Sequence, residues 1–115
     1  MIDGDCQTFV SDCQVRAATE LLHHAWDPVV LSALRSGPTR RNELLMRIGG
    51  ISDKVLTEAL RRLQARALVT RTRGSEAAPG GAVYQLSALG ESFVHGPLAH
   101  LARWAADHQG ELAAP

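Results

Sequence analysis

The chain has 115 residues, the size of one compact domain and too small for two independent hydrophobic cores. Of these residues 45% are apolar, but no apolar run approaches the ~20 residues that span a bilayer and no signal segment opens the chain, so we expect a cytoplasmic protein. The formal net charge is zero, which excludes a uniformly basic protein and leaves only local charge as a basis for binding nucleic acid.

The first part of the chain has the apolar periodicity of helices. Ser11 or Asp12 can cap a first helix, which we expect to end near Trp26. Asp27 and Pro28 indicate the start of a second helix, because proline is favoured at the first helical position, where its missing N–H costs nothing. The residues expected on the buried side of this helix are Val29, Val30, Leu31 and Leu34.

A third and a fourth helix are separated by a tight turn. Thr39 caps the third helix, and Gly49-Gly50 ends it with residues that tolerate positive φ. Ser52 caps the fourth helix, and Ile51 can pack against Leu56 across this cap. The residues expected on its buried side are Leu56, Ala59, Leu60 and Leu63.

A β-hairpin follows the fourth helix. Its strands are predicted at Leu68–Thr72 and Val83–Leu86, and its tip is the Gly/Ser/Ala/Pro stretch Gly74–Gly81. Ser87 caps a last helix, in which Gly96-Pro97 should cause a kink or an interruption. The fold class expected is therefore mainly α with a small β-hairpin wing, a winged helix-turn-helix.

This order of elements also predicts the domain organisation and a partner. We expect a flexible N-terminal arm at 1–12, one winged helix-turn-helix domain with N- and C-terminal dimerisation helices at 13–109, and a frayed tail at 110–115. In such a fold the second helix of the helix-turn-helix pair enters the major groove of DNA, while the hairpin rests on the backbone.

The distribution of charge agrees with a DNA-facing centre. Ten of the twelve basic residues and only three acidic ones lie from Arg35 to Arg73, so this segment has a net charge of +7 and the flanks together have −7. Double-stranded DNA is contacted by a local basic surface, although charge alone is equally consistent with a solvated charged face.

Individual DNA contacts are predicted from the outer side of the fourth helix and from nearby arginines. Arg61 and Lys54 can bind a guanine or a phosphate, and Thr57 can meet a thymine methyl group. The alternative is a solvated face with a weak ion pair between Glu58 and Arg62. The predicted DNA-binding residues are Arg40, Arg41, Ser52, Asp53, Lys54, Thr57, Glu58, Arg61, Arg71 and Arg73.

Several short patterns in the sequence are typical of one family of regulators. They are Cys13 followed by Trp26, R-x-N-E-L at Arg40–Leu44, G-I-S-x-K-x-L-T-x-x-L-x-x-L at Gly50–Leu63, L-V-x-R at Leu68–Arg71, Y-x-L-S/T-x-L-G at Tyr84–Gly90, and Trp104. With these motifs the sequence resembles the HxlR family, a branch close to the MarR-type winged-helix regulators. It departs from the family pattern at Ala78–Gly81, where a basic wing residue is usual, and at Gly96-Pro97.

The resemblance implies a homodimer, joined mainly by the first and last helices, that binds a palindromic promoter operator. We expect a repressor at the nucleoid, and activation is the alternative that the sequence leaves open. The resemblance also places a sensing thiol at Cys13. Independent of the family, a helix N-terminus favours a thiolate, and Cys6 can act as a resolving partner. The alternative is a buried helix-start cysteine beside a dispensable tail cysteine, and the expected reducing compartment makes a structural disulfide a poor default.

Other functions find less support in the sequence. The histidines at positions 23, 24, 100 and 108 lack a metal-ligand spacing, so we expect no metal and assign His100, Trp104 and His108 to dimer packing. Trp26 and Trp104 can line a pocket for a small-molecule effector, although a tryptophan more often anchors a core.

We expect no cofactor and no enzymatic activity, since the sequence has no Gly-rich phosphate loop, nucleophile elbow or paired carboxylates. The alternative function is a winged-helix protein-interaction module that does not bind DNA.

Overall fold

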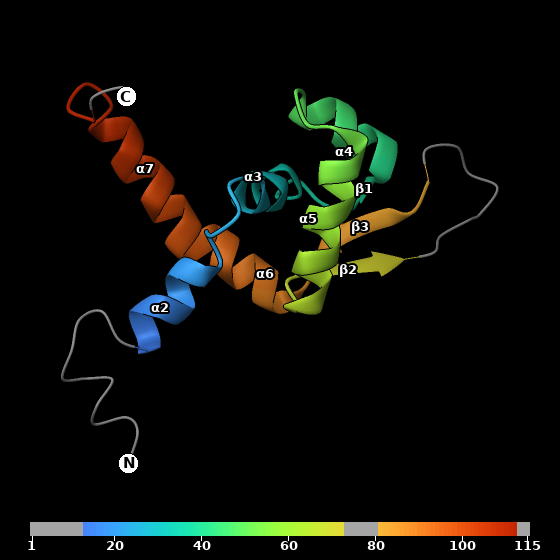
Figure 1. Cartoon of the computed structure of the whole chain (residues 1–115), viewed down its shortest axis with the longest axis horizontal. Helices are drawn as coiled ribbons and strands as arrows, with labels where there is room; N and C mark the ends of the chain where they lie inside the picture. The colour runs from blue at the N-terminus through green and yellow to red at the C-terminus, as the bar shows by residue number, and fades with distance from the viewer. Residues whose placement is uncertain (1–12, 73–80, 113–115) are drawn as a thin grey trace, which may run out of the picture.

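The computed structural model describes residues 13–72 and 81–112 of the chain. In chain order the elements are α2 (Cys13–Glu20), α3 (Trp26–Ala33), β1 (Thr39–Arg40), α4 (Arg41–Ile48), α5 (Asp53–Ala65), β2 (Val69–Thr72), β3 (Val83–Leu86), α6 (Ala88–Phe93), the π-helix η1 (Val94–Leu98) and α7 (Ala99–Asp107). Figure 1 shows α4, α5 and the β2–β3 hairpin at one end, with α2 and α7 at the other. The expected caps Ser11 and Asp12, the 1–12 arm and most of the hairpin tip lie outside the described residues.

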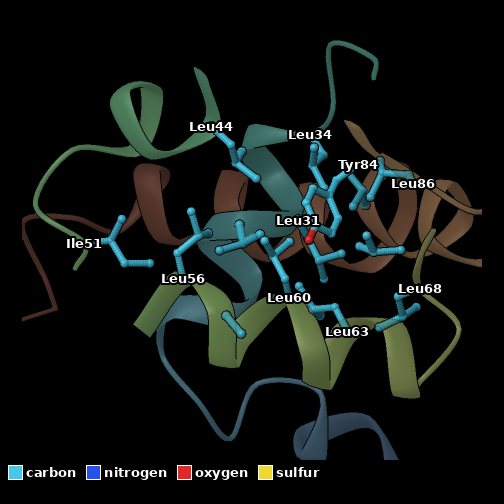
Figure 2. Close-up of a cluster of buried hydrophobic side chains, with 14 residues drawn as sticks. Leu31, Leu34, Leu44, Ile51, Leu56, Leu60, Leu63, Leu68, Tyr84 and Leu86 are labelled. Atoms are coloured by element: carbon cyan, nitrogen blue, oxygen red, sulfur yellow. The ribbon is translucent and has the colours of Figure 1, made fainter. Parts of the chain in front are cut away.

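The hydrophobic core lies between α3, α4, α5 and the sheet. Figure 2 shows Leu60 and Leu63 of α5 pointing toward Leu31 of α3. All four residues expected on the buried side of α5 are buried, which confirms the periodicity that predicted it. The core residues are Val30, Leu31, Leu34, Leu44, Ile51, Leu56, Ala59, Leu60, Leu63, Leu68, Val69, Tyr84, Leu86 and Val94.

The sheet has three antiparallel strands in the order β1-β3-β2. The predicted hairpin is confirmed, except that its first strand begins at Val69, because Leu68 closes a turn in which its N–H donates to the Leu63 carbonyl at 3.0 Å. Strand β1 was not predicted; it pairs Thr39 with Tyr84. A strand of two residues is too short to show the alternation of apolar and polar residues by which a strand is predicted from sequence.

The starts and ends of the first two helices differ from the prediction. Helix α2 ends at Glu20, before Trp26, because turns at 21–25 replace the last helical turn. Helix α3 begins at Trp26, so Pro28 occupies its third position. Val29 is 42% exposed rather than buried, since Val29 and Leu31 lie about 200° apart around a helix and cannot both face one core.

The predicted helix caps were right in most cases. The Ser52 Oγ accepts a hydrogen bond from the Val55 N–H at 3.1 Å, and the Ser87 Oγ accepts one from the Gly90 N–H at 3.0 Å. Gly49 and Gly50 end α4 with φ of 67° and 73°. Thr39 is not the cap of α4, because it is held in β1 and its hydroxyl donates instead to the Gly37 carbonyl at 2.9 Å; Arg40 is the cap residue.

The chain stays helical through Gly96-Pro97, and the expected kink or interruption takes the form of a π-helical turn rather than a break. Residues Val94–Leu98 form a π-helical turn between α6 and α7, and Figure 1 shows one rod running from orange to red. A wider turn accommodates a proline, which lacks an N–H donor and would clash with an ordinary helical turn. Within the described residues, no helix is both long and apolar enough to cross a membrane.

Candidate nucleic-acid interface

Helix α5 has one buried face and one outward face. Its leucines pack into the core, whereas Lys54, Glu58 and Arg61 are exposed and Thr57 is half-buried. In the described residues neither Lys54 nor Arg61 has an ion-pair partner. The outward side of this helix, which sequence reasoning identified as the groove-reading surface, is therefore not packed inside the chain.

Arg41 joins α4, α5 and the hairpin. Its Nη1 lies 2.6 Å from the Asp53 Oδ1, and its Nη2 donates to the Asp53 carbonyl at 3.0 Å and to the Thr57 hydroxyl. Its backbone N–H donates to the Ala82 carbonyl, just before β3, at 2.9 Å. Three predicted DNA-binding residues are therefore bound to one another, and Arg41 has a positioning role that sequence reasoning missed.

Arg47 is a second positioning residue that sequence reasoning missed. From the last turn of α4, its Nη1 donates to the Ala33 carbonyl at 2.8 Å and to the Ser36 hydroxyl at 3.0 Å. Its Nη2 lies 3.1 Å from a Glu43 carboxylate oxygen. These bonds fix the loop between α3 and β1 against α4. The position of the helix-turn-helix relative to α3 depends on this contact.

Arg62 pairs with Asp27 of α3. The expected partner, Glu58, forms no ion pair with it. The Nε donates to both carboxylate oxygens at 3.1 and 3.3 Å, and the Nη2 donates to Oδ1 at 2.8 Å. This hydrogen bonding is the main cause that raises the pKa of Arg62 above its ordinary value. Asp27 is 4% exposed, so the pair lies at the buried contact between α3 and α5.

A polar cavity of about 320 Å³ lies between the outward side of α5 and the hairpin. It is lined by Thr57, Leu60, Arg61, Gln64, Arg71 and Tyr84. Two of the predicted DNA contacts, Arg61 and Arg71, are thus brought to one place. Arg40 is exposed at the start of α4. Arg73 lies outside the described residues, and so does most of Ala78–Gly81, where the sequence lacks the basic wing residue that is usual in the family.

Cys13 is the exposed first residue of α2, and it is disulfide-bonded. The sequence has one other cysteine, Cys6, which lies outside the described residues. Both the buried-cysteine alternative and the expectation against a disulfide are therefore wrong for Cys13. The sequence argument failed because it relied on an assumed reducing compartment, which says nothing of local geometry.

The two tryptophans differ in their surroundings. Trp26 packs against the core at the start of α3, while Trp104 of α7 is 51% exposed and its ring stacks on His108 at 4.5 Å between centroids. A second cavity, of about 240 Å³, lies near α6 and η1, and neither tryptophan lines it. A shared effector pocket at Trp26 and Trp104 stays a prediction.

A sequence profile described as HxlR-like helix-turn-helix matches residues 21–112. The chain belongs to this family. The family predicted from the motifs is thereby confirmed, and with it the winged helix-turn-helix fold and the class of helix-turn-helix transcription regulators.

Individual relatives agree with this assignment. The HTH-type transcriptional regulator YtfH of Escherichia coli (strain K12) is 32% identical over 96 residues, covering 84% of this chain and 75% of the relative. A crystal structure of the HTH-type transcriptional regulator ytcD is similar with a TM-score of 0.74 at 32% identity, covering 86% of this chain and 99% of that one. The reduced form of the regulator YodB from B. subtilis is similar with a TM-score of 0.72 at 26% identity, covering 90% and 99%. A quinone-bound form of YodB has a TM-score of 0.68 at 26% identity, covering 82% and 97%.

Proposed function

We propose that this chain is a sequence-specific DNA-binding repressor, which binds a palindromic promoter operator as a homodimer and acts in the cytoplasm at the nucleoid. The observation that supports it is the division of α5 into a buried leucine face and an outward polar face. The major groove of B-DNA admits one α-helix, so α5 would lie there with Lys54 and Glu58 toward the base edges and Arg61 within reach of a guanine or a phosphate. Ser52 and Asp53 stand at its leading end, and Arg40, Arg71 and Arg73 would contact phosphates.

The test measures binding of the full-length protein to a labelled duplex from the promoter of its own gene and to a random duplex. Wild type should prefer the promoter duplex, and its affinity should fall steeply with salt. The variant K54E/R61E should lose at least about a hundredfold in affinity, since two attractive contacts become repulsive. The matched control is R103E on α7, an exposed residue about 200° around the helix from Leu101, and sedimentation velocity must first show that this variant is still a dimer.

Two results would contradict the groove assignment. One is equal affinity of K54E/R61E and wild type, and the other is a folded dimer that binds no duplex at any salt concentration. The second result would favour the alternative function, a winged-helix module that binds other proteins.

Dimerisation through α2 and α7 is supported by what these helices expose. Neither helix has a buried residue within the single chain, and α7 presents Leu101 at 47% and Trp104 at 51% exposure. A helix with an exposed apolar face is more stable when a second surface covers that face. A dimer also contacts more DNA than one small module, which gives enough contacts for sequence specificity. Under this proposal L101D/W104D is a monomer in sedimentation velocity, while M46D remains a dimer, because Met46 lies on α4 and is 80% exposed. A dimeric L101D/W104D would reject this interface.

Thiol oxidation is the proposed regulatory signal, supported by the disulfide at Cys13. The thiolates of Cys13 and of Cys6, its resolving partner, would form one S–S bond and give up two electrons to a two-electron oxidant such as a quinone, which takes two protons from water and becomes a hydroquinone. Operator affinity of wild type should then differ between reduced and oxidised samples, whereas C13S and C6S should not respond. A C13S variant that responds like wild type would point to a small-molecule effector instead.

A further inference from the structure

We propose that the cavity between α5 and the hairpin is a binding site for one phosphate group of the DNA backbone, held jointly by Arg61, Arg71 and the Tyr84 hydroxyl. This inference rests on the proposed function and assigns one ligand to one place in it. The cavity has a volume of about 320 Å³, and its polar lining carries two arginines but no carboxylate.

Arg71 reaches this cavity because of the register of the hairpin. Arg71 and Tyr84 are opposite residues in the antiparallel β2–β3 pair, so both side chains lie on the same face of the sheet. Arg61 and Gln64 approach from α5, where they are three residues apart and therefore neighbours on the helix surface. The site is thus built from α5, which would enter the major groove, and from the β2–β3 hairpin, which would lie along the DNA backbone.

Neither arginine has a counter-ion in the described part of the chain. Arg61 and Arg71 form no ion pair there, and Glu58, the acidic residue nearest in sequence on α5, does not line the cavity. Most other arginines of the helix-turn-helix are paired internally, as Arg41, Arg47 and Arg62 show. Two guanidinium groups at one cavity without an acid favour an anion as the missing partner.

The Tyr84 hydroxyl is an independent indication of a ligand. The residue is only 7% exposed, yet its hydroxyl has no hydrogen-bond partner among the described residues. No fully buried side-chain oxygen or nitrogen in those residues lacks a partner, so this hydroxyl keeps some contact with solvent, and Tyr84 is one of the residues that line the cavity. Phosphate oxygens commonly accept hydrogen bonds from arginine, glutamine and tyrosine side chains.

The test uses full-length protein and a labelled random duplex, on which binding depends on backbone contacts alone. Y84F removes one neutral donor and keeps the ring in the core, so affinity should fall about tenfold while the slope of log K against log salt stays unchanged. R61Q and R71Q alone should each change this slope little, because the other arginine still neutralises the same phosphate. The double variant R61Q/R71Q should reduce the slope by about one for each protomer, which is about two for the bound dimer.

The controls separate this inference from the proposed function. R103Q removes one exposed positive charge outside the cavity lining and, once sedimentation velocity shows that it is still a dimer, should leave affinity and slope unchanged. Wild-type affinity in Y84F, or a slope per bound dimer reduced by about two in each single variant and about four in the double, would overturn a shared phosphate site.

If wild type binds no duplex, the proposed function fails, and titration with inorganic phosphate then tests the cavity directly. Chemical-shift changes at the arginine Nε groups that need about tenfold more phosphate in Y84F would keep an anion site for a free oxyanion, while the absence of such changes in wild type would overturn it.

Discussion

The Asp27–Arg62 pair should be among the most stabilising polar contacts between α3 and α5. Its carboxylate is almost fully buried, with 6% of the side chain exposed, and all of its hydrogen bonds in the described residues come from Arg62. R62M would leave this carboxylate without a partner, and breaking a buried pair in this way costs about 3 kcal/mol. For a chain of this length that corresponds to a decrease in Tm of about 12 °C.

The assay is thermal and denaturant unfolding at fixed protein concentration, since the Tm of a dimer depends on concentration. D27N should cost less than R62M, because the arginine left behind is 27% exposed and can be hydrated. The matched control is R66M, which removes a longer ion pair with the exposed Glu20 at 3.7 Å and should cost less than about 1 kcal/mol. A coupling energy below about 0.5 kcal/mol in the D27N/R62M cycle, or equal losses in R62M and R66M, would refute the reasoning.

Further predictions concern the close packing at Gly90, the helix cap at Ser52 and the dependence of stability on pH. A Cβ on Gly90 would lie 2.1 Å from the Leu68 carbonyl oxygen, so G90A should destabilise the fold by at least about 3 kcal/mol in urea unfolding, whereas G96A, with open space around it, should be neutral or slightly stabilising. S52A should cost about 1 kcal/mol, measured in the same way, because the Val55 N–H loses its acceptor; a loss near zero would mean that water replaces this cap. Because the pKa of Arg62 is raised, its contribution is fully present below its ordinary, strongly basic pKa, so the difference between wild type and R62M should stay constant from about pH 6 to about pH 9.

Features governed by neighbouring residues were predictable from the sequence. The caps at Ser52 and Ser87 each join a side chain to a backbone N–H three residues later, and Gly49-Gly50 needs only a local positive φ. The buried face of α5 follows from leucines at helical spacing. Such signals lie within one or two helical turns, so a single sequence contains all the information that they require.

Contacts between distant residues were not predictable in the same way. Arg41 binds Asp53 twelve positions away, and Asp27 and Arg62 are thirty-five apart, so nothing in the local pattern distinguishes these arginines from solvated ones. The sequence therefore placed Arg41, Asp53 and Thr57 together on a DNA surface, whereas the structure joins them to one another. Only the relative placement of α4 and α5 reveals this difference.

The positive charge of the 35–73 segment therefore has two separate uses. Arg41, Arg47 and Arg62 are paired with carboxylates and connect α3, α4, α5 and the start of β3, so they hold the helix-turn-helix in one geometry. Their charge is already neutralised within the chain and adds little to the field at a DNA phosphate. The number of phosphates that one protomer neutralises should consequently be below the ten basic residues of the segment, because the three paired arginines leave at most seven cations for the duplex. Charge segregation indicated the right region, but internal pairing decides which of its arginines can contact DNA.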